Sequence, residues 1–260
     1  MSSRYPAVYQ QWKDDPHAFW AEAARGIDWF EPYDRVFDDA RTPLVRWFTG
    51  GRVNTCHNAL DRHVAAGDGD RVALIHDSPV TGRGRRYSYA ELRDETARCA
   101  GALRELGVET GDRVLIYMPM VPQAVVAMLA CARIGAVHSV VFGGFAAREL
   151  ATRIEDAKPK LVVAATCGIE VQRVIPYLPL LQRALEIARH RPSHCLLLQR
   201  PEHRATLEAS ITAVDWDEAL QAASPADCVP LDGNAPLYIL YTSGTTGVPK
   251  GVVRDNAGHM

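Results

Sequence analysis

The stretch RVLIYMPMVPQAVVAMLACARIGAVHSVVF, residues 113–142, decides the fold class of this chain. Residues 113–118 and 138–142 are short apolar runs that are typical of buried strands. Between them, Pro122 suits the first position of a helix, where a missing N–H removes no hydrogen bond. The predicted helix, 122–134, is apolar on nearly all sides, which is typical of a helix between a sheet and another layer. The stretch therefore predicts a strand–helix–strand unit.

Alternating strands and helices extend outward from this unit. Ser88 and Glu91 form a predicted capping box, in which each side chain accepts a hydrogen bond from an orphan backbone N–H, and Gly107 ends the helix that begins there. Further helices are predicted at 146–157, 178–190 and 217–223, further strands at 71–76, 161–165, 195–198 and 237–241, and a charged turn at 82–86. This alternation predicts an α/β fold, a mostly parallel sheet with helices on both faces.

The first 62 residues differ in character from the rest. They contain four of the five tryptophans, at positions 12, 20, 29 and 47, and Asp and Pro residues interrupt their helical stretches. We expect a helical and irregular N-terminal segment that wraps around another body, with aromatic side chains as packing anchors. The predicted organisation is a wrapping segment, residues 1–62, followed by an α/β domain, residues 63–260.

Length and composition are those of a soluble globular protein. The 260 residues correspond to one large domain or two modest ones, with 47% hydrophobic and 23% charged residues. The net charge of −2, from 29 basic and 31 acidic residues, argues against a nucleic-acid partner. Residues 115–132 could be mistaken for a membrane span, but Pro119, Pro122 and Gln123 interrupt them, so we expect no membrane partner either.

The six cysteines, at positions 56, 99, 131, 167, 195 and 228, include no CxxC pair. This spacing argues against a zinc ribbon or a redox dithiol and favours buried, reduced thiols. His190 and His194 are separated by Pro192, so they cannot share a helix face as metal ligands. No metal site is predicted among these side chains. Since no secretory signal is visible at the N-terminus, we expect a cytoplasmic protein.

The stretch YTSGTTGVPKG, residues 241–251, carries the strongest functional signal. Its glycines permit sharp turns and close approach of the backbone to a ligand. Four hydroxyl side chains, free backbone N–H groups and Lys250 supply donors and a positive charge for a polyphosphate. A polar hairpin loop is the simpler alternative, but it needs fewer hydroxyls. The spacing differs from a Walker P-loop, and no GxGxxG follows the first strand.

These residues resemble the phosphate-binding signature of the adenylate-forming enzymes, which include acyl-CoA synthetases and luciferases. The resemblance covers nearly the whole chain and is to the short-chain branch, nearer to propionate–CoA ligases than to acetate–CoA ligases. The stretches that carry it are DPHAFW (15–20), WF (47–48), NALDRH (58–63), YMPM (117–120), MLACARIG (128–135), HSVVFGGF (138–145) and VVRDN (252–256).

The resemblance implies a two-step reaction. ATP and a short-chain carboxylate give an acyl-adenylate and pyrophosphate, and the thiol of coenzyme A then displaces AMP. It also implies that the phosphates of ATP, with Mg²⁺, are held by one loop. The residues of that loop are Thr242, Ser243, Gly244, Thr245, Thr246, Gly247 and Lys250.

Two further segments resemble regions that lie against coenzyme A in the family. The implied contacts are Phe142, Gly143, Gly144, Arg173, Ile175 and Pro176. An aromatic ring beside two glycines could stack on an adenine, and Arg173 could pair with phosphates as a fork-shaped donor. The alternatives are that residues 142–144 are only the end of a strand and that Arg173 is only a surface charge. The chain departs from the pattern at Val171-Gln172, where the propionate branch has Pro-Gly, and at Glu170, where the acetate branch has Arg.

Other family elements lie downstream of the phosphate loop, including the catalytic lysine, the acidic magnesium ligand and the mobile C-terminal domain. We therefore expect an incomplete large N-terminal domain of the adenylate-forming fold, with no catalytic residue of its own. Acetate is the alternative substrate. A non-catalytic phosphate- or nucleotide-binding fragment, and a truncated product that does not fold stably, are alternative interpretations. Nothing in the sequence indicates an oligomeric state.

One prediction concerns activity. With propionate, ATP and Mg²⁺, the 260-residue chain should release pyrophosphate only at the background rate, because the implied catalytic lysine lies outside it. A coupled assay of pyrophosphate release measures this, with a full-length ligase of the same branch as the positive control. Turnover above background would contradict the expectation of an incomplete enzyme.

Overall fold

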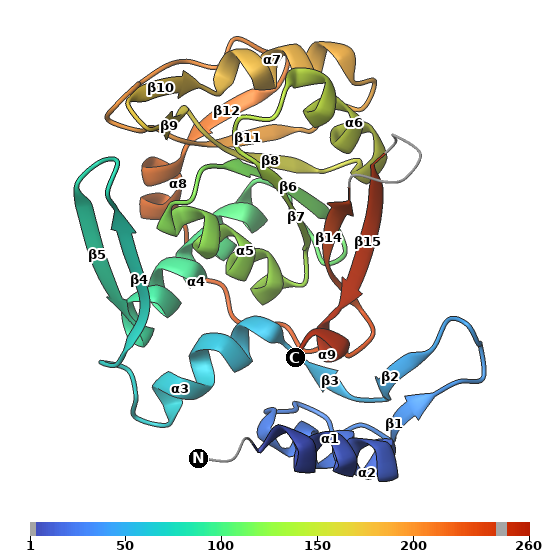
Figure 1. The fold of residues 1–260 in the computed structure, drawn as a ribbon. Helices are drawn as coiled ribbons and strands as arrows, with labels where there is room; N and C mark the ends of the chain where they lie inside the picture. The colour runs from blue at the N-terminus through green and yellow to red at the C-terminus, as the bar shows by residue number, and fades with distance from the viewer. Residues whose placement is uncertain (1–3, 243–248) are drawn as a thin grey trace.

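The computed structural model describes residues 4–242 and 249–260, and a seven-stranded sheet forms its centre (Figure 1). The strand order is β12-β11-β8-β6-β7-β14-β15, and every neighbouring pair is parallel except β14 and β15. The strands are β6 (Arg113–Met118), β7 (Val137–Phe142), β8 (Leu161–Ala165), β11 (His194–Leu198), β12 (Thr212–Asp215), β14 (Pro236–Thr242) and β15 (Lys250–Asp255). The predicted α/β fold with a mostly parallel sheet is confirmed.

Helices cover both faces of this sheet, as predicted. Side chains of β6 alternate between two cores, because Val114 and Ile116 face one side while Leu115 and Tyr117 face the other. The first core is covered by α4 (Tyr89–Glu105), α5 (Pro122–Ile134) and α8 (Trp216–Ala222), and the second by α6 (Ala147–Ala157) and α7 (Leu178–Ile187). A short helix, α9 (Asn256–His259), follows β15.

Residues 5–65 form short elements that lie against one end of the α/β body (Figure 1). They are α1 (Tyr5–Asp14), α2 (Pro16–Ala23), η1 (Ala24–Gly26), β1 (Arg35–Asp38), β2 (Arg46–Thr49), β3 (Arg52–Val53), η2 (His57–Asp61) and α3 (Arg62–Ala65). Trp20, Trp29 and Trp47 make ring contacts within this segment, as the packing role predicts. The segment joins the body where β3 pairs with β13 (Leu231–Asp232).

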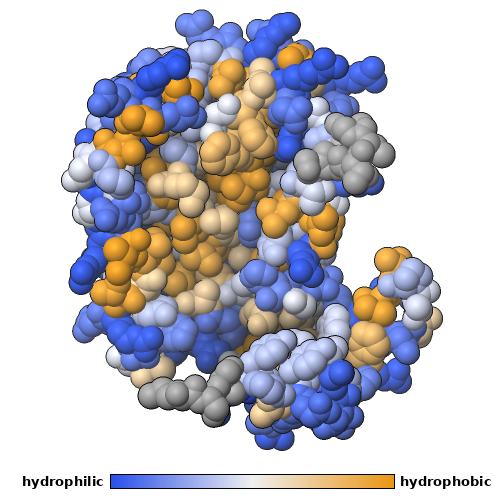
Figure 2. All heavy atoms as spheres, viewed as in Figure 1, coloured by the Kyte–Doolittle hydropathy of each residue, from blue (hydrophilic) through white to orange (hydrophobic). Residues whose placement is uncertain are grey.

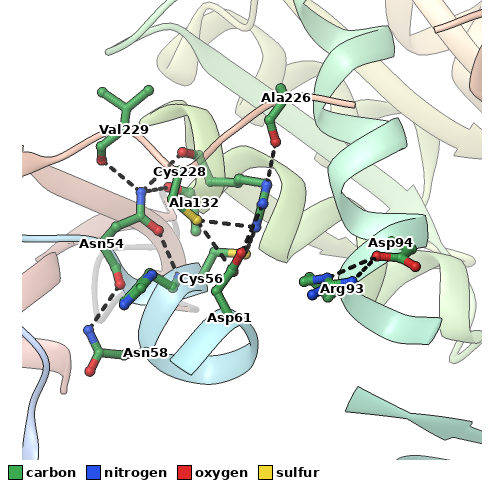
Figure 3. Close-up of polar contacts among 12 residues, drawn as sticks. Asn54, Cys56, Asn58, Asp61, Arg93, Asp94, Ala132, Ala226, Cys228 and Val229 are labelled. Carbon is green, nitrogen blue, oxygen red and sulfur yellow. Dashed lines mark hydrogen bonds and ion pairs between the residues drawn. The ribbon is translucent and has the colours of Figure 1, made fainter. Parts of the chain in front are cut away.

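Two buried polar side chains fix this junction (Figure 3). The amide of Asn54, which is fully buried, donates to the carbonyl oxygens of Ala132, Arg133 and Val229 at 2.9–3.0 Å. Arg133 forms a two-pronged ion pair with Asp61, at 2.7 and 3.0 Å. Each bond joins the N-terminal segment to the α/β body. Because a buried polar group is costly without partners, these bonds favour a single docking geometry.

One predicted turn is wrong. Residues 82–86 do not form a charged turn, since β5 (Arg83–Ser88) pairs antiparallel with β4 (Val72–Ser78). This two-stranded arm projects beside the body in Figure 1. The arginines of β5 are exposed and Tyr87 is buried, so Tyr87 alone gives this strand an apolar pattern in the sequence. The predicted helix at 178–190 also ends earlier, because Ala188 is already extended.

Apolar side chains remain at the surface along the β14–β15 hairpin, where Leu240, Val252 and Val253 are about half exposed (Figure 2). The described helices include none that is both long and apolar enough to cross a bilayer.

A prediction concerns His138 on β7. Burial lowers the pKa of this histidine to about 4, with His259 adding to the effect, and its Nδ1 atom has no hydrogen-bond partner. Between pH 6.5 and 4 the unfolded chain therefore binds more protons than the folded one at this position, so stability falls as the pH falls. We expect about 3 kcal/mol less stability at pH 4 than at pH 7 from this residue alone.

Urea unfolding of the wild type and of His138→Gln at pH 4, 5.5 and 7 measures the effect. The variant should lose less free energy of unfolding than the wild type over this range. Equal losses in the two proteins would show that other groups cause the acid sensitivity.

Candidate functional site

The parallel strands direct their carboxyl ends to the same edge of the sheet. The connection after β6 leads to α5 on one face, whereas the connection after β7 leads to α6 on the other. Ligands of open α/β sheets bind in the crevice that such a reversal creates. Since β14 is parallel to β7, Thr242 at its carboxyl end lies at this edge too. The candidate site is therefore built around the carboxyl ends of β6, β7 and β14.

A groove of about 320 Å³ lies at the carboxyl ends of β6 and β7. One side is formed by the tip of the β4–β5 arm, and the other by β9 (Cys167–Glu170), which forms a hairpin with β10 (Arg173–Pro176). Its lining comprises His76–Thr81, Met118–Val121, Val140, Phe142, Gly143, Ile169, Glu170, Tyr177 and Arg200. The groove thus combines apolar and charged side chains, as small-molecule sites do.

Tyr177 brings two walls of this groove together. A Cβ atom on Gly143 would lie 2.4 Å from the Tyr177 hydroxyl, and one on Gly168 would lie 2.0 Å from it. Glycine is therefore needed at both positions, because any larger side chain would overlap the tyrosine. The two glycines allow the end of β7 and the β9–β10 hairpin to close on the same phenol.

A second tyrosine anchors the backbone that follows β7. The Tyr117 hydroxyl donates to the Phe145 carbonyl at 3.3 Å and accepts from the Gly144 N–H at 3.4 Å. Burial raises the pKa of Tyr117 to about 12, so the phenol stays neutral and keeps its proton to donate. Its ring packs on Tyr177 with centroids 5.0 Å apart. The loop at residues 142–145 is thus held by its backbone.

Two of the six predicted coenzyme A contacts line the groove. Phe142 is 65% exposed, and with Gly143 it lines the cavity. Arg173, Ile175 and Pro176 lie on β10, where Arg173 and Ile175 pair with Glu170 and Gly168 of β9. Gly144 and these three β10 residues are near the groove but do not line it. Their role in binding coenzyme A stays a prediction.

The departure noted at Val171-Gln172 falls on the turn of this hairpin. Val171 has a φ of +54°, a left-handed conformation that β-branched residues rarely adopt, and its side chain is 84% exposed. The turn therefore projects a valine into solvent where the propionate branch has Pro-Gly.

Of the predicted phosphate-binding residues, Ser243, Gly244, Thr245, Thr246 and Gly247 lie outside the described residues. Thr242 and Lys250 flank them and face each other as the last described pair of the β14–β15 ladder. Both are exposed, and across residues 4–242 and 249–260 no carboxylate forms an ion pair with Lys250. A hydroxyl and an unneutralised ammonium group at the carboxyl edge of the sheet fit an anionic ligand.

Tyr241, which precedes Thr242, is hydrogen-bonded to a side chain of α6. The Tyr241 hydroxyl donates to the Asp156 carboxylate at 2.6 Å, and the Arg153 guanidinium lies 5.4 Å from the centre of its ring. Burial and the bond to Asp156 raise the pKa of Tyr241. The carboxyl end of β14 is thereby fixed against the helix that follows β7.

Sequence reasoning missed a charged cluster beside the groove, of which Arg200 lines the groove itself. Arg200 is nearly buried and lies 3.5 Å from Glu202, and Glu202 also pairs with Arg83 of the β4–β5 arm at 3.1 Å. The three residues connect the arm to the end of β11. No local pattern signals this, because Arg83 and Arg200 are far apart in sequence.

Among the described residues, one group has the spacing of metal ligands: Cys56, Asp61 and Cys228, whose ligand atoms lie within 4.8 Å of one another. The Arg133 guanidinium already bonds to the Asp61 carboxylate and to the Cys228 sulfur, at 2.7 and 3.1 Å. A metal cation would have to displace this internal cation, so we assign no metal to the group.

Two family models and several known proteins match this chain over most of its length. The sequence model of a family described as "AMP-binding enzyme" matches residues 61–260, and one described as "Acetyl-coenzyme A synthetase N-terminus" matches residues 5–59. The chain is 50% identical to an acyl-CoA synthetase short-chain family member 3 of Bos taurus, over 94% of this chain and 36% of the relative. It is 46% identical to a propionate–CoA ligase of Salmonella typhimurium, over 98% of this chain and 41% of the relative.

The fold has a close counterpart among solved structures. An acetoacetyl-CoA synthetase from Streptomyces lividans superposes with a TM-score of 0.85 at 29% identity, over 99% of this chain and 39% of that one. The chain thus spans about two fifths of the length of the relatives it matches. The resemblance to short-chain acyl-CoA synthetases inferred from the sequence is confirmed.

A prediction tests the close approach at Tyr177. Gly168→Ala should destabilise the chain by about 1–3 kcal/mol, because its Cβ atom would overlap the phenol and force the hairpin or the ring to move. Gly26→Ala is the matched control, since nothing lies within 4 Å of its added Cβ atom. Thermal unfolding of the two variants measures the difference. Equal melting temperatures would contradict the tight packing between Gly168 and Tyr177.

Proposed function

Because the chain belongs to the family of AMP-binding enzymes, we propose that it is the N-terminal part of a short-chain carboxylate–CoA ligase. Such a ligase forms an acyl-adenylate from ATP and the acid, and then an acyl-CoA with release of AMP. We propose propionate as the acid. The likeness to the Salmonella propionate–CoA ligase supports this choice. Acetate is the alternative, and the match of residues 5–59 to the acetyl-coenzyme A synthetase N-terminus favours it.

One observation carries the proposal. Thr242 and Lys250 face each other where the β14–β15 hairpin reaches the carboxyl edge of the sheet, and the hydroxyl-rich segment lies between them in sequence. In this proposal, Thr242, Lys250 and that segment bind the β- and γ-phosphates of ATP. Pyrophosphate carries several negative charges, so a fixed ammonium group stabilises it as it leaves.

Mg²⁺ and coenzyme A complete the proposed set of ligands. Mg²⁺ is bound mainly by oxygens, and the phosphates of ATP supply them together with hydroxyl side chains such as Thr242. The groove beside Phe142 and Gly143 is the proposed site for the nucleotide part of coenzyme A. The exposed ring of Phe142 offers a stacking face, and Arg173 at the end of the hairpin offers a donor for phosphate.

The organisation and setting of the ligase follow the same reasoning. We propose two parts, residues 1–62 as the wrapping segment and residues 63–260 as part of the ligase domain, supported by the change between family matches near residue 60. The proposed partners are small molecules only. A cytoplasmic setting is proposed, supported by six cysteines that are all free.

A prediction tests the phosphate site. Lys250→Ala should weaken binding of MgATP to the chain by about tenfold or more, because a hydrogen-bonded charge is lost from the phosphate contact. Lys13→Ala is the control, since Lys13 lies on α1 beside Tyr9 and away from the sheet edge. Isothermal titration calorimetry measures both. ATP affinity that is unchanged in Lys250→Ala would overturn the proposal.

A further inference from the structure

Two cysteine thiols lie side by side where the N-terminal segment meets the α/β body (Figure 3). Cys56 immediately precedes η2, and Cys228 lies in the extended chain between α8 and β13. Their sulfur atoms are within 4.8 Å of each other. A single nitrogen of Arg133, Nη1, contacts both, at 3.6 Å from the Cys56 sulfur and 3.1 Å from the Cys228 sulfur.

The backbone on both sides of this pair is held in place. Asn54, two residues before Cys56, donates to the carbonyl of Val229, the residue after Cys228, at 2.9 Å. Arg133 donates to the carbonyl of Ala226 at 2.6 Å. These bonds keep the two chain segments, and so the two sulfurs, at a fixed separation. Groups held together in this way react at a high effective concentration.

The pair also differs from the other cysteines in its surroundings. Cys228 is the one cysteine that is not fully buried, so part of this residue is in contact with solvent. Cys99 and Cys131 are fully buried among apolar side chains of α4 and α5. Neither sulfur has a neighbouring guanidinium group or contact with solvent. These two cysteines are therefore controls for the oxidation of Cys56 and Cys228.

We propose that Cys56 and Cys228 form a thiol pair that hydrogen peroxide closes to a reversible disulfide. In the first step the Cys228 sulfur attacks one oxygen of hydrogen peroxide. The O–O bond breaks, the thiol proton goes to the departing hydroxide to give water, and a sulfenic acid remains. The Cys56 thiol then attacks this sulfur, an S–S bond forms, and a second water leaves. Two electrons pass from the two thiols to the peroxide.

Neighbouring charges assist these steps. The Cys228 thiol donates to the Asp61 carboxylate at 3.5 Å, so Asp61 can relay the thiol proton to the departing hydroxide. The Arg133 guanidinium stabilises negative charge that develops on either sulfur. A hydrogen bond that the Cys228 thiol donates to Cys56, together with burial, raises the pKa of Cys228. Little of Cys228 is therefore a thiolate at neutral pH. We expect its oxidation to be slower than that of an exposed cysteine and to require a high concentration of hydrogen peroxide.

Closure of the disulfide would have a structural consequence. Residues 56 and 228 are 172 positions apart (228 minus 56), and the bond would tie the N-terminal segment covalently to the body. Cross-linking distant positions restricts the unfolded chain, so the oxidised form should melt at a higher temperature than the reduced form.

The test uses the whole 260-residue chain, reduced and then treated with millimolar hydrogen peroxide. Intact mass should fall by two hydrogen atoms, and a non-reducing tryptic digest should contain the peptide of Cys56 linked to that of Cys228. Dithiothreitol should restore the original mass and the original melting temperature. Cys228→Ala should abolish the linked peptide, whereas Cys99→Ala should retain it.

Three results would overturn the proposal. They are a chain that keeps its mass, oxygen adducts on Cys228 without a linked peptide, or a linked peptide from another pair of cysteines. The digest is made on the wild type, so it decides the matter even where a variant folds poorly. The result is independent of ATP binding, and the thiol pair can therefore fail without affecting the proposed ligase function.

Discussion

Parallel pairing is the constraint on which the site depends. Because β6, β7, β8 and β14 all run in the same direction, their carboxyl ends and the chain that follows them meet at one edge. Residues that are distant in sequence are therefore brought together without any direct bond between them. The exposed aromatic ring of Phe142 lies at that edge for this reason. Lys250 lies there because the antiparallel strand β15 begins opposite Thr242, the last residue of β14. The roles that we propose for Thr242 in ATP binding and for Phe142 in coenzyme A binding depend on this geometry.

A second set of contacts fixes how the N-terminal segment docks on the α/β body. The junction of the N-terminal segment has apolar contacts, because Leu60 is buried in the core beneath α4 and α5, and Phe48 packs with Ala257. Polar bonds add to these contacts: Asn54 donates to three carbonyl groups, and Arg133 forms an ion pair with Asp61. Such bonds contribute little net free energy but tolerate few alternative arrangements. The same bonds hold two thiols in contact, so one feature serves both docking and the proposed redox chemistry.

The sequence predicts local structure well and long-range contacts poorly. Residues 113–142 contain their own periodicity and breakers, and the strand–helix–strand unit that they predict is present. The capping box of Ser88 and Glu91 is present for the same reason. Strand β5 was mistaken for a turn, because pairing with β4 stabilises it despite its charged residues. The Arg83–Glu202 pair and the Cys56–Cys228 pair depend on tertiary contacts, which no local pattern encodes. Most of the phosphate loop lies outside the described residues, so its geometry stays a prediction.

The phenol wedged between two glycines also limits how this groove can diverge among relatives. Gly143 and Gly168 each contact the same ring, so neither can gain a side chain unless the residue at 177 becomes smaller. The three positions should therefore change together or not at all. In relatives that bind a different ligand at this groove, we expect substitutions at the turn of the β9–β10 hairpin and in the β4–β5 arm. We expect fewer substitutions around Tyr177.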